Sequence, residues 1–143
     1  MNGGITVETI NVIYVEPGKE ARVIEMKDEL SEMQKLVGGY IEEYMPFEDD
    51  VALICNDEGK MNGLPLNRGI HGEDGQLQDI IAGPFFICYA PIESEKFLSL
   101  PKDLEEKYQK KFDKPEQFFR TDSGIKAVKY DPIPQTERVA EGR

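Results

Sequence analysis

The residues Thr9-Ile10-Asn11-Val12-Ile13-Tyr14-Val15, followed by Glu16-Pro17-Gly18-Lys19, give the clearest indication of the fold. The first seven are rich in β-branched side chains, which favour extended backbone, and they predict a strand over 9–15. Proline and glycine at the two central positions of the next four residues suit a type II turn. Residues 21–26 return to strand-forming side chains, so the whole stretch predicts a β-hairpin and an antiparallel sheet.

Four later segments also have the composition of strands, with apolar or β-branched residues bounded by glycine, proline and acidic turns. These expected strands span residues 40–45, 51–55, 77–81 and 85–89, and residues 125–130 add a late one. The turn Asn56-Asp57-Glu58-Gly59 follows the second of them and predicts a positive φ at Gly59. The stretch 62–69 is rich in glycine, proline and asparagine, and it predicts an ordered loop.

Two segments have the periodicity of amphipathic helices. The first spans about residues 28–37, with Asp28 at the N-cap position and Gly38-Gly39 as its end. The second spans about residues 101–113 and begins with a proline, which the first turn of a helix tolerates. We therefore expect an α+β fold, a mostly antiparallel sheet with two helices.

The charge of the chain is high and unevenly distributed. Its 143 residues fit one domain, expected over residues 1–130 with a flexible tail over 131–143, and they carry a net charge of −11. Residues 1–95 hold 19 acidic and 6 basic side chains, whereas residues 96–129 hold 9 basic and 6 acidic ones. An acidic surface repels nucleic acid and favours a cationic partner, although many cytoplasmic proteins are acidic for solubility alone.

The sequence predicts a cytoplasmic protein. Its apolar runs are far shorter than the ~20 residues that span a bilayer. The N-terminus Met1-Asn2-Gly3-Gly4 has neither the basic start nor the apolar stretch of a signal peptide. In the cytoplasm thiols stay reduced, so we expect Cys55 and Cys88 to be buried free thiols within apolar strands rather than a disulfide.

Few residues carry recognisable chemistry. His71 is the single histidine, and we expect it in an exposed loop, which leaves little basis for zinc ligation or histidine-based acid–base catalysis. The acidic turn Glu48-Asp49-Asp50 lacks the spacing of a calcium loop, and no glycine-rich phosphate-binding motif is present. We expect no catalytic residues, no metal and no cofactor. A metal-dependent hydrolase that uses Asp49 or Asp50 is the alternative enzyme hypothesis.

The loop Asn62–Arg68 sets two amides and an arginine around an apolar centre. Such side chains often satisfy backbone groups, and Arg68 has acidic residues elsewhere in the chain with which to pair. In the functional interpretation, Asn62, Asn67 and Arg68 bind a polar or anionic ligand beside Tyr40 and Tyr44. Both interpretations stay open at the level of sequence.

Residues 96–129 combine lysines with aromatic side chains, a composition also found in nucleic-acid-binding segments. Here the aromatic residues fit the buried face of the second helix, and the local excess of basic side chains is small. We interpret the lysines as a solvated helix face, and we expect neither direct nucleic-acid binding nor membrane binding.

Several phrases of the sequence, taken in order, resemble one known family. They are VEPGK (15–19), LVGGYIE (36–42), PFEDDVALICN (46–56), GK (59–60), NGLPLNR (62–68) and DIIAG (79–83) followed by FF (85–86). This series, over about residues 12–92, resembles the uncharacterised family of domain of unknown function 3846. The resemblance implies a setting in Gram-positive bacteria, their phages and conjugative elements, and it implies no catalytic residues. Residues 93–130 are then a helical extension of the family-like core.

Two functions from different classes follow from these observations. In the first, a non-catalytic protein of a phage or mobile element binds a basic host factor through an acidic face, in a counter-defence role. The residues expected on this face are Glu42, Glu43, Glu48, Asp49 and Asp50. In the alternative, the chain binds a small ligand or nucleotide with the Asn62–Arg68 loop.

Overall fold

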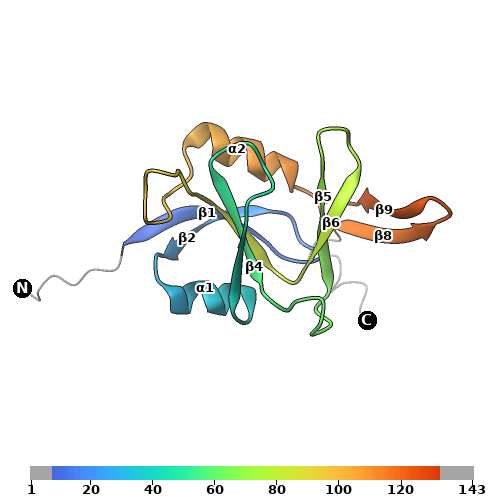
Figure 1. Ribbon diagram of the computed structural model, residues 1–143, viewed down its shortest axis with the longest axis horizontal. Helices are drawn as coiled ribbons and strands as arrows, with labels where there is room; N and C mark the ends of the chain where they lie inside the picture. Colours follow the sequence, from blue (N-terminus) through green and yellow to red (C-terminus); the bar gives the residue numbers. More distant parts are fainter. Residues whose placement is uncertain (1–7, 133–143) are drawn as a thin grey trace, which may run out of the picture.

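A five-stranded antiparallel sheet with one helix on each face forms the body of the computed structural model, which describes residues 8–132 (Figure 1). In chain order the elements are β1 (Thr9–Val15), β2 (Arg22–Lys27), α1 (Leu30–Val37), β3 (Ile41–Tyr44), β4 (Val51–Asn56), β5 (Leu66–His71), β6 (Leu77–Ala82), β7 (Phe85–Tyr89), α2 (Lys102–Lys111), β8 (Glu116–Thr121) and β9 (Gly124–Lys129).

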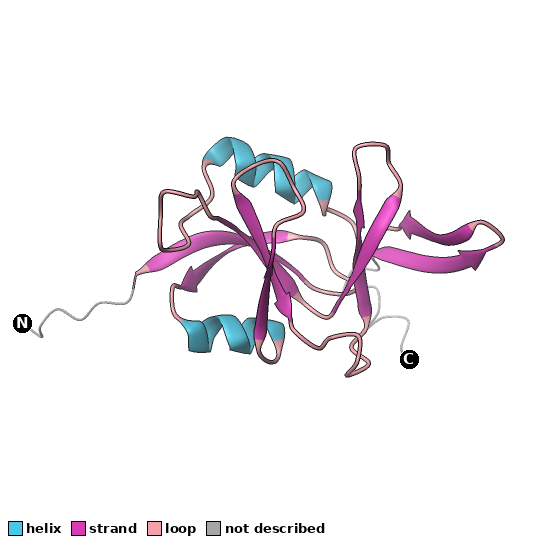
Figure 2. Cartoon of the chain, viewed as in Figure 1, coloured by secondary structure: helices cyan, strands magenta, loops and turns pink. Residues whose placement is uncertain are grey.

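The order of strands in the main sheet is β2-β1-β7-β4-β3, and every neighbouring pair is antiparallel. Two separate two-stranded sheets, β5-β6 and β8-β9, lie beyond one end of it (Figure 2). This architecture confirms the expected α+β class, with mostly antiparallel strands and two helices.

The β1–β2 hairpin forms where the sequence predicts it. Gly18 has a φ of 76°, the positive value that a type II turn requires at this position. The Lys19 N–H donates to the Glu16 carbonyl oxygen at 3.2 Å and closes the turn. Strand β1 then pairs with β7 on its other side, so the hairpin forms one edge of the sheet.

Alternation along the central strands divides the apolar side chains between two cores. Leu53 and Phe85 point toward α2, where Tyr108 and Phe112 cover them together with parts of the β5–β6 hairpin. The residues that lie next to them in β4 and β7 point the other way and pack against α1. Strands β4 and β7 are therefore buried on both faces, which explains their nearly continuous apolar sequences.

Helix α1 begins later than the sequence predicts. Glu29 rather than Asp28 occupies the N-cap position, with extended backbone and no side-chain capping bond. The Asp28 N–H donates to the Glu8 carbonyl oxygen at 2.8 Å, which keeps the chain extended at the end of β2. The expected end is confirmed, because Gly38 has a φ of 80° and its N–H donates to the Gln34 carbonyl oxygen.

The two smaller hairpins differ from expectation. Residues 66–69, expected in a loop, belong to β5, which pairs with β6 in an irregular register. The late strand is confirmed as β9, but its partner β8 has no counterpart among the expected strands. The β8–β9 hairpin extends away from the body of the molecule (Figure 1) and most of its side chains are exposed. It therefore lacks the alternation of buried and exposed residues that marks a strand in sequence.

Gly59 is required for close packing and not for its backbone angle. Its φ is not positive, contrary to the sequence prediction. A Cβ atom at this position would lie 2.5 Å from the carbonyl oxygen of Ala82, so only glycine lets the turn after β4 approach the end of β6.

Neither helix among residues 8–132 is long and apolar enough to cross a membrane. A flexible tail is expected over residues 131–143. Residues 133–143 lie outside the described part of the chain, so the structure does not test this expectation.

Candidate functional site

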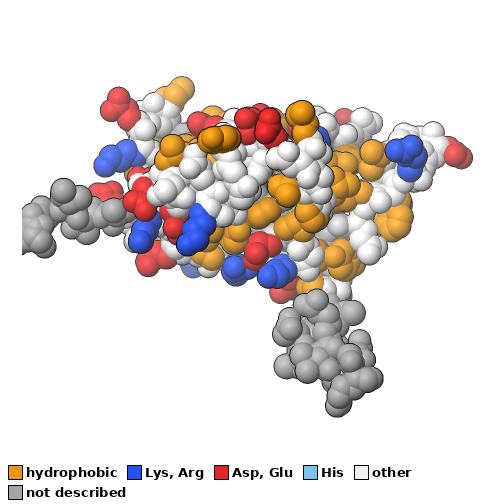
Figure 3. Space-filling view, turned by 90° about the horizontal axis from the view of Figure 1, so that it is seen from below, with side chains coloured by type: hydrophobic (Ala, Val, Ile, Leu, Met, Phe, Trp, Pro, Cys, Tyr) orange, Lys and Arg blue, Asp and Glu red, His pale blue; other side chains and the backbone are white. Residues whose placement is uncertain are grey.

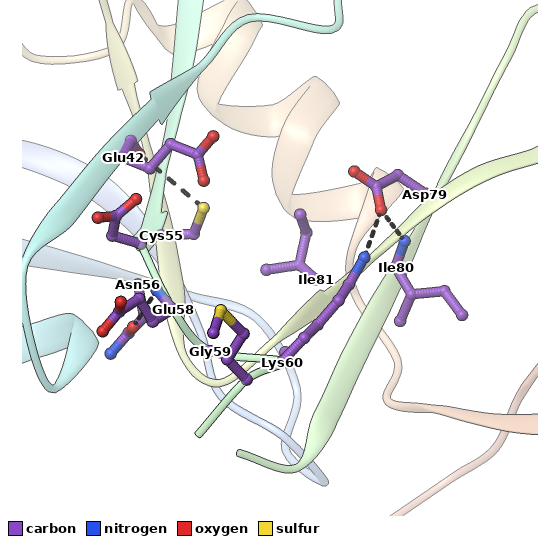
Figure 4. Close-up of a pocket in the computed structure, with 12 residues that line it drawn as sticks. Glu42, Cys55, Asn56, Glu58, Gly59, Lys60, Asp79, Ile80 and Ile81 are labelled. Carbon is purple, nitrogen blue, oxygen red and sulfur yellow. Dashed lines mark hydrogen bonds and ion pairs between the residues drawn. The ribbon is translucent and has the colours of Figure 1, made fainter. Parts of the chain in front are cut away.

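A hollow of about 150 Å³ lies beside the end of β4, where the turn that follows this strand faces β6 (Figure 4). Four carboxylates and one ammonium group line it, together with backbone and apolar atoms. The charged residues are Glu42, Asp57, Glu58, Asp79 and Lys60. We call this site the acidic hollow, since its carboxylates outnumber its single cation.

Strand pairing sets one wall of the acidic hollow. Glu42 of β3 lies opposite Cys55 of β4, and because the two are paired across the strands their side chains lie on the same face of the sheet. The Cys55 thiol contacts the Glu42 carbonyl oxygen at 3.9 Å. Figure 4 shows Glu42 and Asp79 on opposite sides of the hollow, although they come from different sheets.

The buried side-chain amide of Asn56 fixes the turn after β4, which forms one edge of the acidic hollow. Its Oδ1 accepts a hydrogen bond of 2.8 Å from the Glu58 N–H, and its Nδ2 donates to the Val37 carbonyl oxygen at 3.1 Å. The Asp57 N–H donates to the Tyr40 carbonyl oxygen at 2.9 Å. These bonds fix the backbone of the turn to the end of α1 and to Tyr40, just before β3, so the carboxylates of Asp57 and Glu58 project from a rigid base.

Lys60 neutralises only one of the carboxylates. Its Nζ lies 2.8 Å from Asp79 Oδ1, the same oxygen that accepts the Ile80 N–H. The lysine side chain is largely exposed, and such surface pairs contribute little to stability. Glu42, Asp57 and Glu58 have no ion-pair partner among the described residues, so the hollow keeps an excess of negative charge.

Burial, together with the charges of these carboxylates, raises the pKa values of two neighbouring side chains. Burial raises the pKa of the Cys55 thiol to about 12, and the charges of Glu42, Asp79 and Asp57 add to this effect. The pKa of Tyr44 is also raised, first by desolvation and then by Asp79. The Cys55 thiol is therefore protonated near neutral pH and is a poor nucleophile and a poor metal ligand.

The five acids expected on one face separate in the structure. Glu42 and Glu43 are consecutive in β3, so their side chains lie on opposite faces of the sheet. Asp49 is bound to α2, because Lys107 Nζ and Tyr108 Oη lie 2.6 Å and 2.7 Å from its Oδ2. The bond from Lys107 is the main reason that the pKa of Asp49 is lowered. Only Glu42 of the five lines the acidic hollow, while Glu48 and Asp50 are exposed outside it.

The residues expected to bind a ligand are also dispersed. Tyr40 and Asn62 are exposed at separate turns, and Tyr44 packs against the core. Asn67 and Arg68 are buried. Asn67 Nδ2 donates to the carbonyl oxygens of Val15 and Gly83.

Arg68 is 0% exposed and connects three segments of the chain. Its Nε and Nη2 donate to the Phe112 carbonyl oxygen at 3.2 Å and 3.0 Å, and Nη2 also donates to the Lys19 carbonyl oxygen at 2.6 Å. Its Nη1 donates to Asn67 Oδ1 at 2.9 Å. These donors are directed at the protein interior, so we do not retain Asn67 and Arg68 as ligand-binding residues.

The other reactive side chains are dispersed too. Cys55 and Cys88 are both buried free thiols, as the sequence predicts. His71 lies half-buried at the end of β5 and not in an exposed loop. Within residues 8–132, no three His, Cys, Asp or Glu side chains converge in a way that would hold a metal ion. The chemistry that the acidic hollow offers is the binding of a cation or of a hydrogen-bond donor.

Comparison with known proteins gives one match. The model of a family described as domain of unknown function (DUF3846) matches residues 10–113. No curated protein and no solved structure matches the chain. The family match extends further than the phrases over residues 12–92 indicate, because it includes α2, and it ends before the β8–β9 hairpin.

Proposed function

We propose a non-catalytic binding function for this chain, which belongs to the DUF3846 family of domains of unknown function. In this proposal the acidic hollow receives a basic side chain of a partner protein. The observation that carries it is that four carboxylates, from β3, the turn after β4, and β6, line one hollow together with a single cation. Two of these carboxylates lie far apart in sequence, and the fold brings them to opposite walls of one site.

The partner that fits this site is a protein with a basic surface. We propose a host factor in the cytoplasm as this partner, such as a defence or nucleic-acid-handling protein, and hence a counter-defence role, in line with the phage and conjugative-element setting that the sequence resemblance implies. Nucleic-acid-handling proteins carry arginine and lysine clefts that attract phosphate. An acidic surface on a second protein is complementary to such a cleft.

The alternative function, nucleotide binding by the Asn62–Arg68 loop, is less well supported. The guanidinium of Arg68, which this alternative requires for phosphate contact, is buried and donates to backbone carbonyl oxygens. The acidic hollow is lined by the turn that precedes this loop, and its negative charge would repel a phosphate group.

Two consecutive residues of β3 allow a matched test. Glu42→Lys reverses a charge inside the acidic hollow, whereas Glu43→Lys makes the same change on the opposite face of the sheet. The probe is a fluorescein-labelled peptide of alternating arginine and glycine, and its affinity is measured by fluorescence anisotropy. A charge pair at 4 Å in water contributes about 1 kcal/mol, so a reversal costs about 2 kcal/mol, or roughly 30-fold in Kd.

The proposal predicts this loss for Glu42→Lys and a change of less than about threefold for Glu43→Lys. It also predicts that the wild-type protein binds more weakly as salt rises from about 50 mM to about 500 mM, since salt screens exposed charges. Equal losses in the two variants would show a diffuse effect of net charge and would contradict a specific site. Absence of binding by the wild-type protein at low salt would also contradict it.

A further inference from the structure

A larger groove of about 890 Å³ lies between the β5–β6 hairpin and the β8–β9 hairpin. Its walls carry four aliphatic side chains and several polar ones. The aliphatic residues are Leu66, Leu77, Ile80 and Ile125, of which Leu66 is 46% exposed and Ile125 48% exposed. On the face seen in Figure 3, hydrophobic side chains gather toward the side of the molecule that carries these hairpins. Exposed apolar side chains that line a concave surface are typical of binding sites.

The groove adjoins the acidic hollow. Lys60, Asp79 and Ile80 line both, so the two sites share one boundary on β6 and the turn after β4. A chain lying in the groove therefore reaches the carboxylates at its end. The combined surface offers negative charge at one end and aliphatic contact along the rest.

One wall of the groove comes from the β8–β9 hairpin. The register of the hairpin pairs Ile125 with Arg120 and Ala127 with Phe118, which places these four side chains on one face. Val128 lies on the opposite face, although it is on the same strand and is exposed to a similar degree, at 40%. The hairpin thus presents Ile125 toward β6 and Val128 away from it.

This hairpin lies after residue 113, where the family match ends. The acidic hollow belongs entirely to the matched part of the chain, whereas the groove needs Ser123, Gly124 and Ile125 from the hairpin to be complete. The hairpin therefore adds a second wall beside a site that the family core forms by itself.

We propose that the groove and the acidic hollow together bind one extended segment of a partner protein, in which a basic residue is flanked by aliphatic residues. This inference rests on the proposed function, because the basic residue is the one that the hollow receives. The groove binds the aliphatic residues of the same segment, and Ile125 selects for them. The carboxylates of Glu42, Asp57 and Glu58, which have no ion-pair partner among the described residues, lie at the hollow end and set the direction in which the segment lies.

The test compares two labelled peptides in the same anisotropy assay. One alternates arginine with leucine and the other alternates arginine with serine, so their charge is equal and only the aliphatic contact differs. The wild-type protein is expected to bind the leucine peptide about tenfold more tightly, which corresponds to about 1.4 kcal/mol. Ile125→Glu is expected to remove this preference, and the control Val128→Glu to keep it. Glu42→Lys is expected to weaken the binding of both peptides.

The possible failures are distinguishable. If neither peptide binds the wild-type protein, the proposed function and this inference fall together. If both peptides bind with equal affinity in a manner that depends on Glu42, the hollow stands and the groove is refuted. Loss of the preference for the leucine peptide in both Ile125→Glu and Val128→Glu also refutes the groove. Substitutions on opposite faces of the hairpin would then have the same effect, which indicates that they disrupt the hairpin and not a specific contact. Light scattering tests a last alternative. If the wild-type protein is a dimer and Ile125→Glu dissociates it, the groove binds a second copy of this chain, and the inference is overturned.

Discussion

Replacement of Arg68 by methionine is expected to destabilise the protein strongly, although the arginine carries a buried charge. The substitution keeps a long side chain but removes every donor. It leaves two buried acceptors, the Phe112 carbonyl oxygen and Asn67 Oδ1, without their bonds from this residue. A buried acceptor left unsatisfied costs about 1–3 kcal/mol, so the two together cost roughly 2–6 kcal/mol.

An opposing effect reduces this loss. Burial lowers the pKa of Arg68, which shows that desolvation penalises its charged form, and methionine does not carry that penalty. The carbonyls remain in place, however, and removal of one partner from a buried polar group is usually destabilising. We therefore expect the free energy of unfolding to fall by about 2–4 kcal/mol.

Urea denaturation followed by circular dichroism measures this change. With an m-value of about 2 kcal/mol per molar urea, in the middle of the usual range, the midpoint is expected to fall by about 1–2 M while m itself stays constant. The control is Arg22→Met, which removes an exposed arginine that contacts Glu16 at 2.6 Å and is expected to cost less than about 1 kcal/mol. A shift for Arg68→Met no larger than that of the control would refute the assignment of Arg68 to the interior.

Three further predictions concern other parts of the chain. Gly59→Ala is expected to lower the free energy of unfolding by about 1–3 kcal/mol, measured by urea denaturation, because its Cβ would contact the Ala82 carbonyl oxygen; a neutral change would contradict this contact. Asp49→Asn is expected to cost about 0.5–1 kcal/mol at neutral pH; because the pKa of Asp49 is lowered in the folded state, this contribution is present above about pH 4 and is lost as pH falls through the folded pKa, so thermal melts of the two proteins should converge at acidic pH. Both cysteines are expected to resist a thiol reagent at about pH 8 in the native protein and to react in denaturant, because burial raises the pKa of each thiol; fast reaction of the native protein would contradict their burial.

The parts of the fold that depend on local patterns could be predicted from the sequence. Strand β1 and the turn at Gly18 depend on β-branched residues and on a Pro-Gly pair, and both are found where the pattern places them. Strand β5 could not be predicted in the same way. Its centre holds asparagine, arginine and glycine, and these residues adopt a strand because segments more than forty positions away in sequence accept the bonds of Arg68.

The candidate site also depends on contacts between residues that are distant in sequence. Glu42 could be proposed from sequence because it lies in an acidic segment, but its separation from Glu43 follows from the strand register. Asp79 gave no signal of its own, since it reaches the acidic hollow only through the packing of β6 beside the turn after β4. The sequence predicts Asp49 as a free surface acid. In the structure it binds Lys107 and Tyr108, because α2 packs beside it.

The position of α2 has a consequence for synthesis on the ribosome. The face of the sheet that includes Leu53 and Phe85 is complete once β7 has been made, but Tyr108 and Phe112 cover it only later. During that interval a nascent chain has an open apolar sheet face, which makes chaperone binding or aggregation more favourable. Termination shortly after Leu100 should therefore yield a product that is recovered bound to chaperones, whereas termination after Asp113 supplies the last side chains of the core.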